Sequence, residues 1–82
     1  MATAFRIRDL RIVIYSNDHW PPHCHVIGRG CEAKVALGEG TAKPSLVTNN
    51  GLSRRQVDTA LTLIIERRET LLEKWRELHG GN

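Results

Sequence analysis

The sequence predicts an α+β fold, in which a three- to four-stranded, mainly antiparallel sheet is followed by a long C-terminal amphipathic helix. Up to residue 48, apolar residues occur in short strand-like runs separated by glycine, proline and asparagine. From residue 53 onward, they recur every three or four positions, which is helical spacing. The 82 residues are expected to form one domain (1–82), with the sheet over 5–48 and the helix over 53–79.

The first strand is expected over residues 10–15, "LRIVIY", because this run is apolar, rich in β-branched residues and followed by turn-forming residues. Arg6 and Arg8 share the strand parity of Leu10, so a strand extended backward would place two charges on its apolar face. We therefore expect the strand to begin near Arg8 or Asp9, or a bulge to redirect its start.

Two further strands are expected over residues 23–28 and 31–37, joined by the Gly-Arg-Gly turn of a hairpin. In the second of these strands, alternate residues from Cys31 to Leu37 form an apolar face. A short edge strand is expected around Leu46 and Val47, before an Asn-Asn-Gly sequence that ends it.

The helix is expected to begin at a capping box formed by Ser53 and Gln56. One unbroken helix to His79 would be about 40 Å long, whereas a compact domain of this size has a radius of gyration of about 12 Å. Either the helix bends near "ERRE", residues 66–69, or its C-terminal half extends beyond the sheet. We favour the second alternative, in which a second copy or a cognate small protein covers the apolar residues of this half. These interface residues are Leu71, Leu72, Trp75 and Leu78.

Composition and charge narrow the function only slightly. The net charge of +3 is mild, so RNA or DNA is a further candidate partner and not a required one. No apolar run is long enough to span a membrane. The N-terminal residues lack the apolar core of a signal peptide, which predicts a cytoplasmic location and free cysteines. The candidate nucleic-acid-binding residues are Arg8, Arg29, Arg54 and Arg55.

Residues 17–26, "NDHWPPHCHV", contain three of the four histidines and concentrate the groups able to carry chemistry. On a strand, His23 and His25 point to one side and Cys24 points to the other. Cys24 is therefore better interpreted as a core thiol than as a nucleophile. Three interpretations of the histidines remain open.

The first interpretation is a metal site. His23 and His25 on one strand face form half of a site, and His19 is expected to be the third ligand, with Asp18 or His79 as alternatives. Zinc is the cofactor in this case, since three protein ligands with an open position are typical of its catalytic sites.

The second interpretation is a metal-independent ribonuclease without a cofactor. His19 and His23 would act as general base and general acid, and Asp18 would orient one of the rings. Arg8, Arg29 or Arg54 would lie near the phosphate and stabilise its transition-state charge.

The third interpretation is a structural turn in a dimer or adaptor without catalysis. Asn17 and Asp18 favour turns, and the two prolines that follow set the direction of the next strand. In this case Trp20 covers the core, while His19 and His25 bond buried backbone groups.

The segment "YSNDHWPPHCHV", residues 15–26, together with the helix "LSRRQVDTALTLIIERRETLLEKW", resembles a small bacterial family, domain of unknown function 4160. The core of that family reads NDHxPPHFHV, so Cys24 stands where a phenylalanine is usual, which agrees with a core-facing side chain. The resemblance implies pairing with another small protein, in the manner of toxin-antitoxin modules. We therefore predict a cytosolic toxin-antitoxin-type or regulatory module that acts through a protein partner and possibly RNA. The histidine stretch would be its active or recognition surface.

Overall fold

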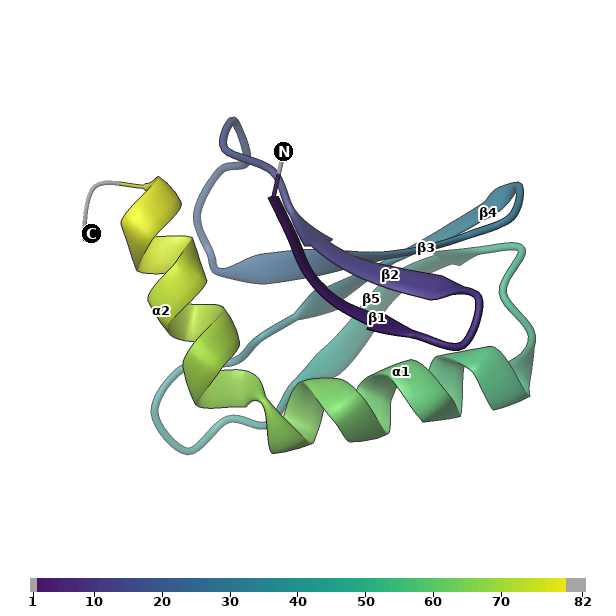
Figure 1. Cartoon of the computed structure of the whole chain (residues 1–82). Coiled ribbons are helices and arrows are strands. Elements are labelled where there is room, and N and C mark those ends of the chain that lie inside the picture. The colour runs from purple at the N-terminus through teal and green to yellow at the C-terminus, as the bar shows by residue number, and fades with distance from the viewer. Residues whose placement is uncertain (1, 80–82) are drawn as a thin grey trace.

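The computed structural model describes the backbone of residues 2–79 and the side chains of residues 5–79 (Figure 1). One antiparallel sheet has its strands in sequence order, and two helices follow it. The predicted α+β class is confirmed, with five strands where three or four were expected and two helices where one was expected. The elements are β1 (Ala2–Ile7), β2 (Leu10–Ile14), β3 (His23–Gly28), β4 (Cys31–Ala36), β5 (Ser45–Asn50), α1 (Arg54–Glu66) and α2 (Arg68–Leu78).

The additional strand is β1, which pairs with β2 in a tight hairpin. Ile7 lies opposite Leu10, so Arg8 and Asp9 form a two-residue turn between the strands. Arg8 has a φ of +54°, a left-handed conformation that glycine or asparagine usually supplies in such turns. Because the turn contains neither residue type, the sequence gives no hairpin signal at this point.

The other elements follow the sequence pattern closely. Arg29 and Gly30 turn the chain between β3 and β4, as the Gly-Arg-Gly signal predicted. The capping box at α1 is also present: Gln56 N–H donates to Ser53 Oγ (3.1 Å), and Ser53 N–H donates to Gln56 Oε1 (2.9 Å). β5 continues through Asn50, so the Asn-Asn pair lies inside the strand that it was expected to end.

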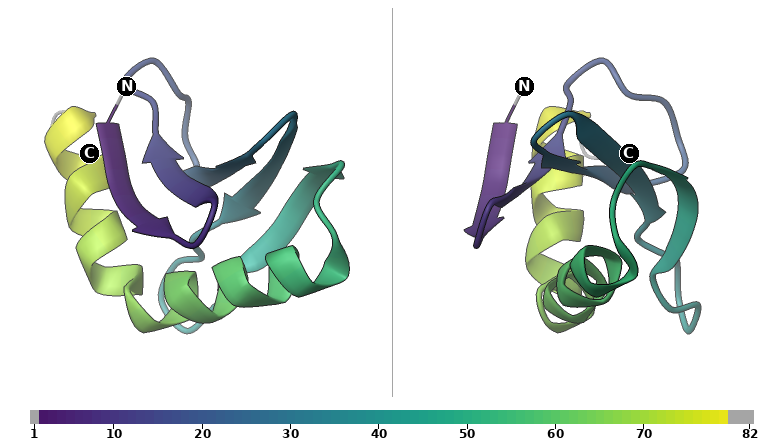
Figure 2. Two further views of the ribbon diagram at one scale, coloured as in Figure 1. Left: turned by 45° about the vertical axis from the view of Figure 1, so that its right-hand side comes forward. Right: turned by 90° about the vertical axis from the view of Figure 1, so that its right-hand side faces the viewer.

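The core lies between the curved sheet and the two helices. α1 runs across the open side of the sheet, and α2 rises along one end of it (Figure 2). Alternation along β4 places Ala33 and Val35 in the core, as expected from its apolar face. The buried core cluster comprises Leu10, Ile12, Ile14, Cys24, Val26, Ala33, Val35, Leu37, Leu52, Ala60, Ile64, Leu71 and Trp75.

The C-terminal helix bends at Arg67. This residue has φ −108° and ψ 19°, which ends α1 and allows α2 to start in a new direction. The longest dimension of the molecule is 33 Å, so a straight helix of about 40 Å would extend past the sheet. The helix therefore bends near residues 66–69, and its C-terminal half does not extend beyond the sheet as we expected from the sequence.

The bend also removes the reason for expecting an interface on α2. Leu71 and Trp75 are only 0% and 1% exposed, because α2 packs them into the core of the same chain. Leu72 and Leu78 are partly buried against that core. The predicted overhang is wrong, since α2 folds back onto the core of its own chain, and a partner chain on the partly exposed Leu72 and Leu78 stays a prediction.

Candidate metal centre

The histidine stretch divides into a loop, residues 15–22, and the start of β3. Within the loop, Asp18 N–H donates to the carbonyl of Tyr15 (3.2 Å), which closes a turn and directs the Asp18 side chain toward the sheet. At the end of the loop, Leu37 N–H donates to the carbonyl of Pro22 (3.0 Å). The loop is therefore held by backbone bonds near both of its ends.

Asp18, His23 and His25 converge where this loop meets β3. Asp18 Oδ2 lies 3.3 Å from His23 Nε2 and 3.2 Å from His25 Nε2. One potential ligand atom from each residue lies within 4.8 Å of the other two. The His23 side chain is nearly buried, while those of Asp18 and His25 are 16% and 15% exposed, so the cluster sits just below the surface.

The second nitrogen of each ring fixes where its proton lies. His23 Nδ1 is 2.8 Å from the carbonyl oxygen of Pro21, and His25 Nδ1 is 2.9 Å from Glu32 Oε2. A carbonyl and a carboxylate can only accept hydrogen bonds, so we assign an N–H to both Nδ1 atoms. In the neutral rings, each Nε2 therefore directs a lone pair at the Asp18 carboxylate.

The two imidazole rings lie with their centroids 5.2 Å apart, and both direct Nε2 at the same Asp18 oxygen. A positive charge placed among these three atoms would stabilise the arrangement. One divalent cation would supply that charge to all three atoms, which lie within 4.8 Å of one another. The two spacings to Asp18 Oδ2, 3.2 and 3.3 Å, are close to the roughly 3.3 Å that separates ligand atoms around tetrahedral zinc.

Neighbouring groups hold the side chains of Asp18, His23 and His25 in place, as the residues that hydrogen-bond to the ligands do in metal sites. The bonds from Nδ1 to Pro21 and Glu32 orient both rings, which is the usual arrangement for metal-binding histidines. Tyr15 N–H donates to Asp18 Oδ2 (3.4 Å), and the Tyr15 ring packs edge-on against His25 at 4.7 Å. The cluster is therefore preorganised by groups outside it.

Glu32 was missed by sequence reasoning, although the hairpin register contains the signal. A two-residue turn at Arg29 and Gly30 pairs Ile27 with Glu32. This pairing makes Glu32 the diagonal neighbour of His25 across the two strands, within reach of a long side chain.

His19 lies outside the cluster, which corrects the predicted ligand set of His19, His23 and His25. The His19 side chain is exposed, and no hydrogen bond from its ring is found among residues 2–79. Asp18, named from the sequence as an alternative ligand, takes its place. The predicted acid–base pairing of His19 with His23 is likewise not formed.

His79, the other alternative ligand, also lies outside the cluster. Its Nδ1 donates to the carbonyl of Trp75 (2.8 Å), and its ring stacks on the Trp75 ring at 3.7 Å. The Trp75 ring in turn packs against His23 at a centroid distance of 5.2 Å. His79 thus supports the packing behind the cluster without contributing a ligand atom.

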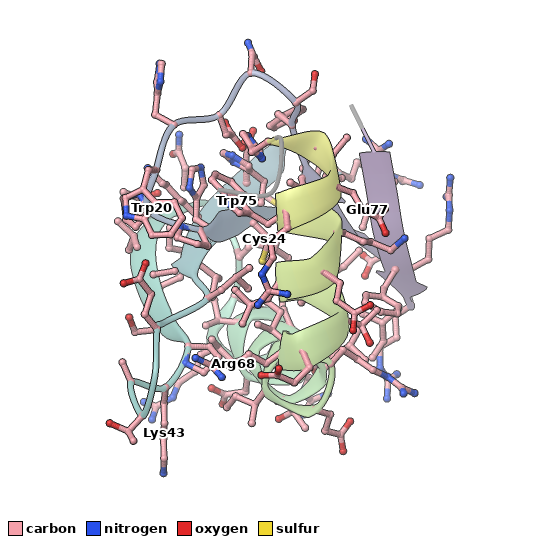
Figure 3. All side chains as sticks on the ribbon, turned by 90° about the vertical axis from the view of Figure 1, so that its left-hand side faces the viewer. Trp20, Cys24, Lys43, Arg68, Trp75 and Glu77 are labelled. Carbon is pink, nitrogen blue, oxygen red and sulfur yellow. The ribbon has the colours of Figure 1, made fainter. Side chains whose placement is uncertain are left out.

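Trp20 does not cover the core, contrary to the structural interpretation of the loop. Its side chain is 61% exposed, and it lines a cavity of about 450 Å³ together with Trp75 and Arg68 (Figure 3). Because the Trp75 ring also contacts His23, this cavity adjoins the cluster.

The arginines proposed for nucleic acid binding lie away from the histidines. Arg29 follows the last residue of β3, and His23 is the first residue of that strand, a separation of about 20 Å along an extended chain. Arg8 lines one depression with Arg29 and another with Arg55, and Arg54 is the first residue of α1, so all four lie toward the same end of the sheet (Figure 1). The ribonuclease arrangement, which needs one of them beside the histidines, is therefore not assembled.

Cys24 lies in the core, as strand alternation predicted, and it is fully buried. This burial raises the pKa of the Cys24 thiol to about 12, which keeps it protonated and unreactive near neutral pH. Cys24 and Cys31 are both free, in agreement with the expectation of no disulfide.

Comparison with known proteins identifies a family. A family model described as "Domain of unknown function (DUF4160)" matches residues 10–76, a segment that runs from β2 into α2 and includes the whole cluster. No curated protein and no solved structure matches the chain. Within the part of the chain that the structure describes, neither helix is both long and apolar enough to cross a membrane.

Proposed function

We propose that this chain, which belongs to the DUF4160 family, binds a divalent transition metal ion through Asp18, His23 and His25. The observation that carries the proposal is the contact of both Nε2 atoms with Asp18 Oδ2 while both Nδ1 atoms serve as donors elsewhere. Zinc is the ion that best fits two imidazoles and a carboxylate at these spacings. The same donor set also suits Fe(II), which belongs in the test.

Such a site would be of the open type. Three protein ligands leave a fourth tetrahedral position for water or another ligand. The partial exposure of Asp18 and His25 gives solvent access to that position. When bound, the ion supplies a Lewis acid, and the residues of the chain hold and orient it.

Metal binding would also link the loop to the sheet. Asp18 belongs to the loop of residues 15–22, whereas His23 and His25 belong to β3, so one ion would tie the two together. The same loop presents His19 and Trp20 to solvent. A recognition surface ordered by metal follows from this connection and suits the regulatory role, through a protein partner, that the family resemblance implies. That role and the toxin-antitoxin assignment stay predictions.

The test is metal binding by protein prepared without a histidine tag. Native mass spectrometry and competition with a chromophoric chelator are expected to show one zinc or iron ion per chain. Asp18→Asn and His25→Gln are expected to weaken binding at least 100-fold, because each removes one of only three ligands. His19→Gln is the matched control, since it removes an exposed histidine outside the cluster and should leave the affinity unchanged.

A milder variant distinguishes a metal site from a cluster that is held by hydrogen bonds alone. Glu32→Gln removes the outer-shell charge on His25 but keeps an oxygen acceptor, so an approximately tenfold loss of metal affinity is expected. Glu73→Gln makes the same charge change at an exposed position on α2 and should have no effect. A chain that stays free of metal at micromolar zinc and iron, or ligand variants that bind as the parent does, would contradict the proposal.

A further inference from the structure

Five arginines gather at the end of the sheet opposite the metal cluster. They line two adjoining depressions that share Arg8, at the side where the β1–β2 turn, the β3–β4 turn and the start of α1 lie together (Figure 1). We call this group the basic end; it consists of Arg6, Arg8, Arg11, Arg29 and Arg55. The structure thus brings three of the arginines singled out from the sequence into one group.

The charge of the basic end is barely compensated. Asp9 is the one acidic residue that lines either depression. None of the ion pairs found among residues 2–79 includes an arginine of the basic end. Glu32, in the same row of the sheet as Arg11, bonds His25 instead.

Two further contacts at this end are unfavourable for the protein alone. Arg6 lies directly opposite Arg11 in the β1–β2 pair, and like charges in that position destabilise a sheet. The first turn of α1 contains Arg54 and Arg55 and no acidic residue, although the helix N-terminus carries partial positive charge. An anion bound here would relieve both repulsions.

From this distribution, we infer that the basic end binds the phosphate backbone of a nucleic acid duplex. Five guanidinium groups spread over two depressions exceed what a single small anion requires, whereas a backbone presents phosphates at regular intervals. No aromatic side chain lines either depression, and binding of single strands usually depends on aromatic stacking. Backbone contacts of this kind are independent of base sequence.

The experiment is fluorescence anisotropy with a 20-base-pair RNA duplex and a DNA duplex of the same sequence, between 50 and 200 mM salt. Binding is expected to weaken with salt with a slope of about −4 in log K against log salt, because four to five phosphate contacts release counterions. Arg8→Gln combined with Arg29→Gln should reduce that slope by about 2 and lower the affinity roughly 50-fold at 0.1 M salt.

The control keeps the net charge of the variant and changes only its position. Arg67→Gln combined with Arg76→Gln removes two exposed charges at the bend and on α2, away from the basic end. This pair should reduce the affinity less than threefold. Adding EDTA should leave duplex binding unchanged, which separates this inference from the metal site.

Three results would overturn the inference. They are the absence of duplex binding at 50 mM salt, an equal loss in the control pair, and tighter binding to the single strands than to either duplex. Binding to both RNA and DNA duplexes supports it, since the phosphate backbone is common to both.

Discussion

At the scale of single residues, the face of β3 to which a side chain points decides whether that side chain can react. Cys24 faces the core and is fully buried, whereas the histidines on either side of it face Asp18. Alternation of side chains explains this separation, so three adjacent residues with reactive groups do not form one site. The thiol belongs to the core and the imidazoles belong to the cluster.

Cys24 is expected to resist alkylation in the folded protein. Burial raises the pKa of its thiol from 9.0 to about 12, which lowers the thiolate fraction at pH 8 by roughly a thousandfold. Mass spectrometry after iodoacetamide treatment should show Cys31 modified first and Cys24 modified only on unfolding. The pKa of this thiol is higher in the folded chain than in the unfolded chain, so its contribution to the free energy of unfolding is fully present below about pH 9. Above that pH the unfolded chain ionises first, and the contribution is lost as the pH rises toward 12. Equal rates for the two cysteines would contradict its placement.

Which residues complete the cluster was only partly readable from the sequence. The shared face of His23 and His25 follows from a period of two, and the structure confirms it. The third member depends on the course of the loop, where Asp18 turns inward and His19 turns out to solvent. Loop direction is set by backbone bonds such as that from Asp18 N–H to Tyr15, for which the sequence offers no periodic pattern.

At the scale of secondary structure elements, the two departures from expectation have local causes. β1 was not anticipated because its turn uses Arg8 in a left-handed conformation without glycine or asparagine. The bend at Arg67 is the alternative that we did not favour from the sequence, and neither proline nor glycine marks it. The strands and the helix start that carry ordinary signals, including the Ser53 cap, were placed correctly.

Arg68 anchors the bend through its side chain. Its Nε donates to the carbonyl of Leu37 (2.9 Å) and its Nη2 to that of Gly40 (3.3 Å), which joins the start of α2 to the loop after β4. Arg68→Ala should lower the free energy of unfolding by about 1 to 2 kcal/mol, because a partly buried carbonyl loses its donor.

Urea denaturation followed by circular dichroism measures this effect. Arg67→Ala is the neighbouring control: its exposed side chain makes no hydrogen bond to another residue within the described chain, so a change below about 0.5 kcal/mol is expected. If both variants lost the same stability, the anchoring role of Arg68 would be wrong.

At the scale of the whole molecule, the bend makes the chain compact enough to cover its own core. The radius of gyration is 11.7 Å, close to the roughly 12 Å expected for a compact chain of this length. α2 closes the end of the sheet beside the metal cluster, and the basic end lies on the other side (Figure 1). The two candidate functional surfaces are thus separated by the sheet that supports both.

Trp75 tests whether this core belongs to one chain. It is 1% exposed within the single chain, so Trp75→Ala should cost about 3 to 5 kcal/mol by leaving a large cavity. Since that approaches the whole stability of a small domain, Trp75→Phe serves as a milder variant with an expected cost of about 1 to 2 kcal/mol. Ile65→Ala, at a residue 52% exposed on α1, should change stability by less than about 0.5 kcal/mol.

Because Trp75 is buried within the single chain, the urea midpoints of the parent and the Phe variant should not move when the protein concentration is varied 50-fold. A midpoint that rises with concentration in the parent and loses that dependence in Trp75→Phe would instead place Trp75 in an interface between chains.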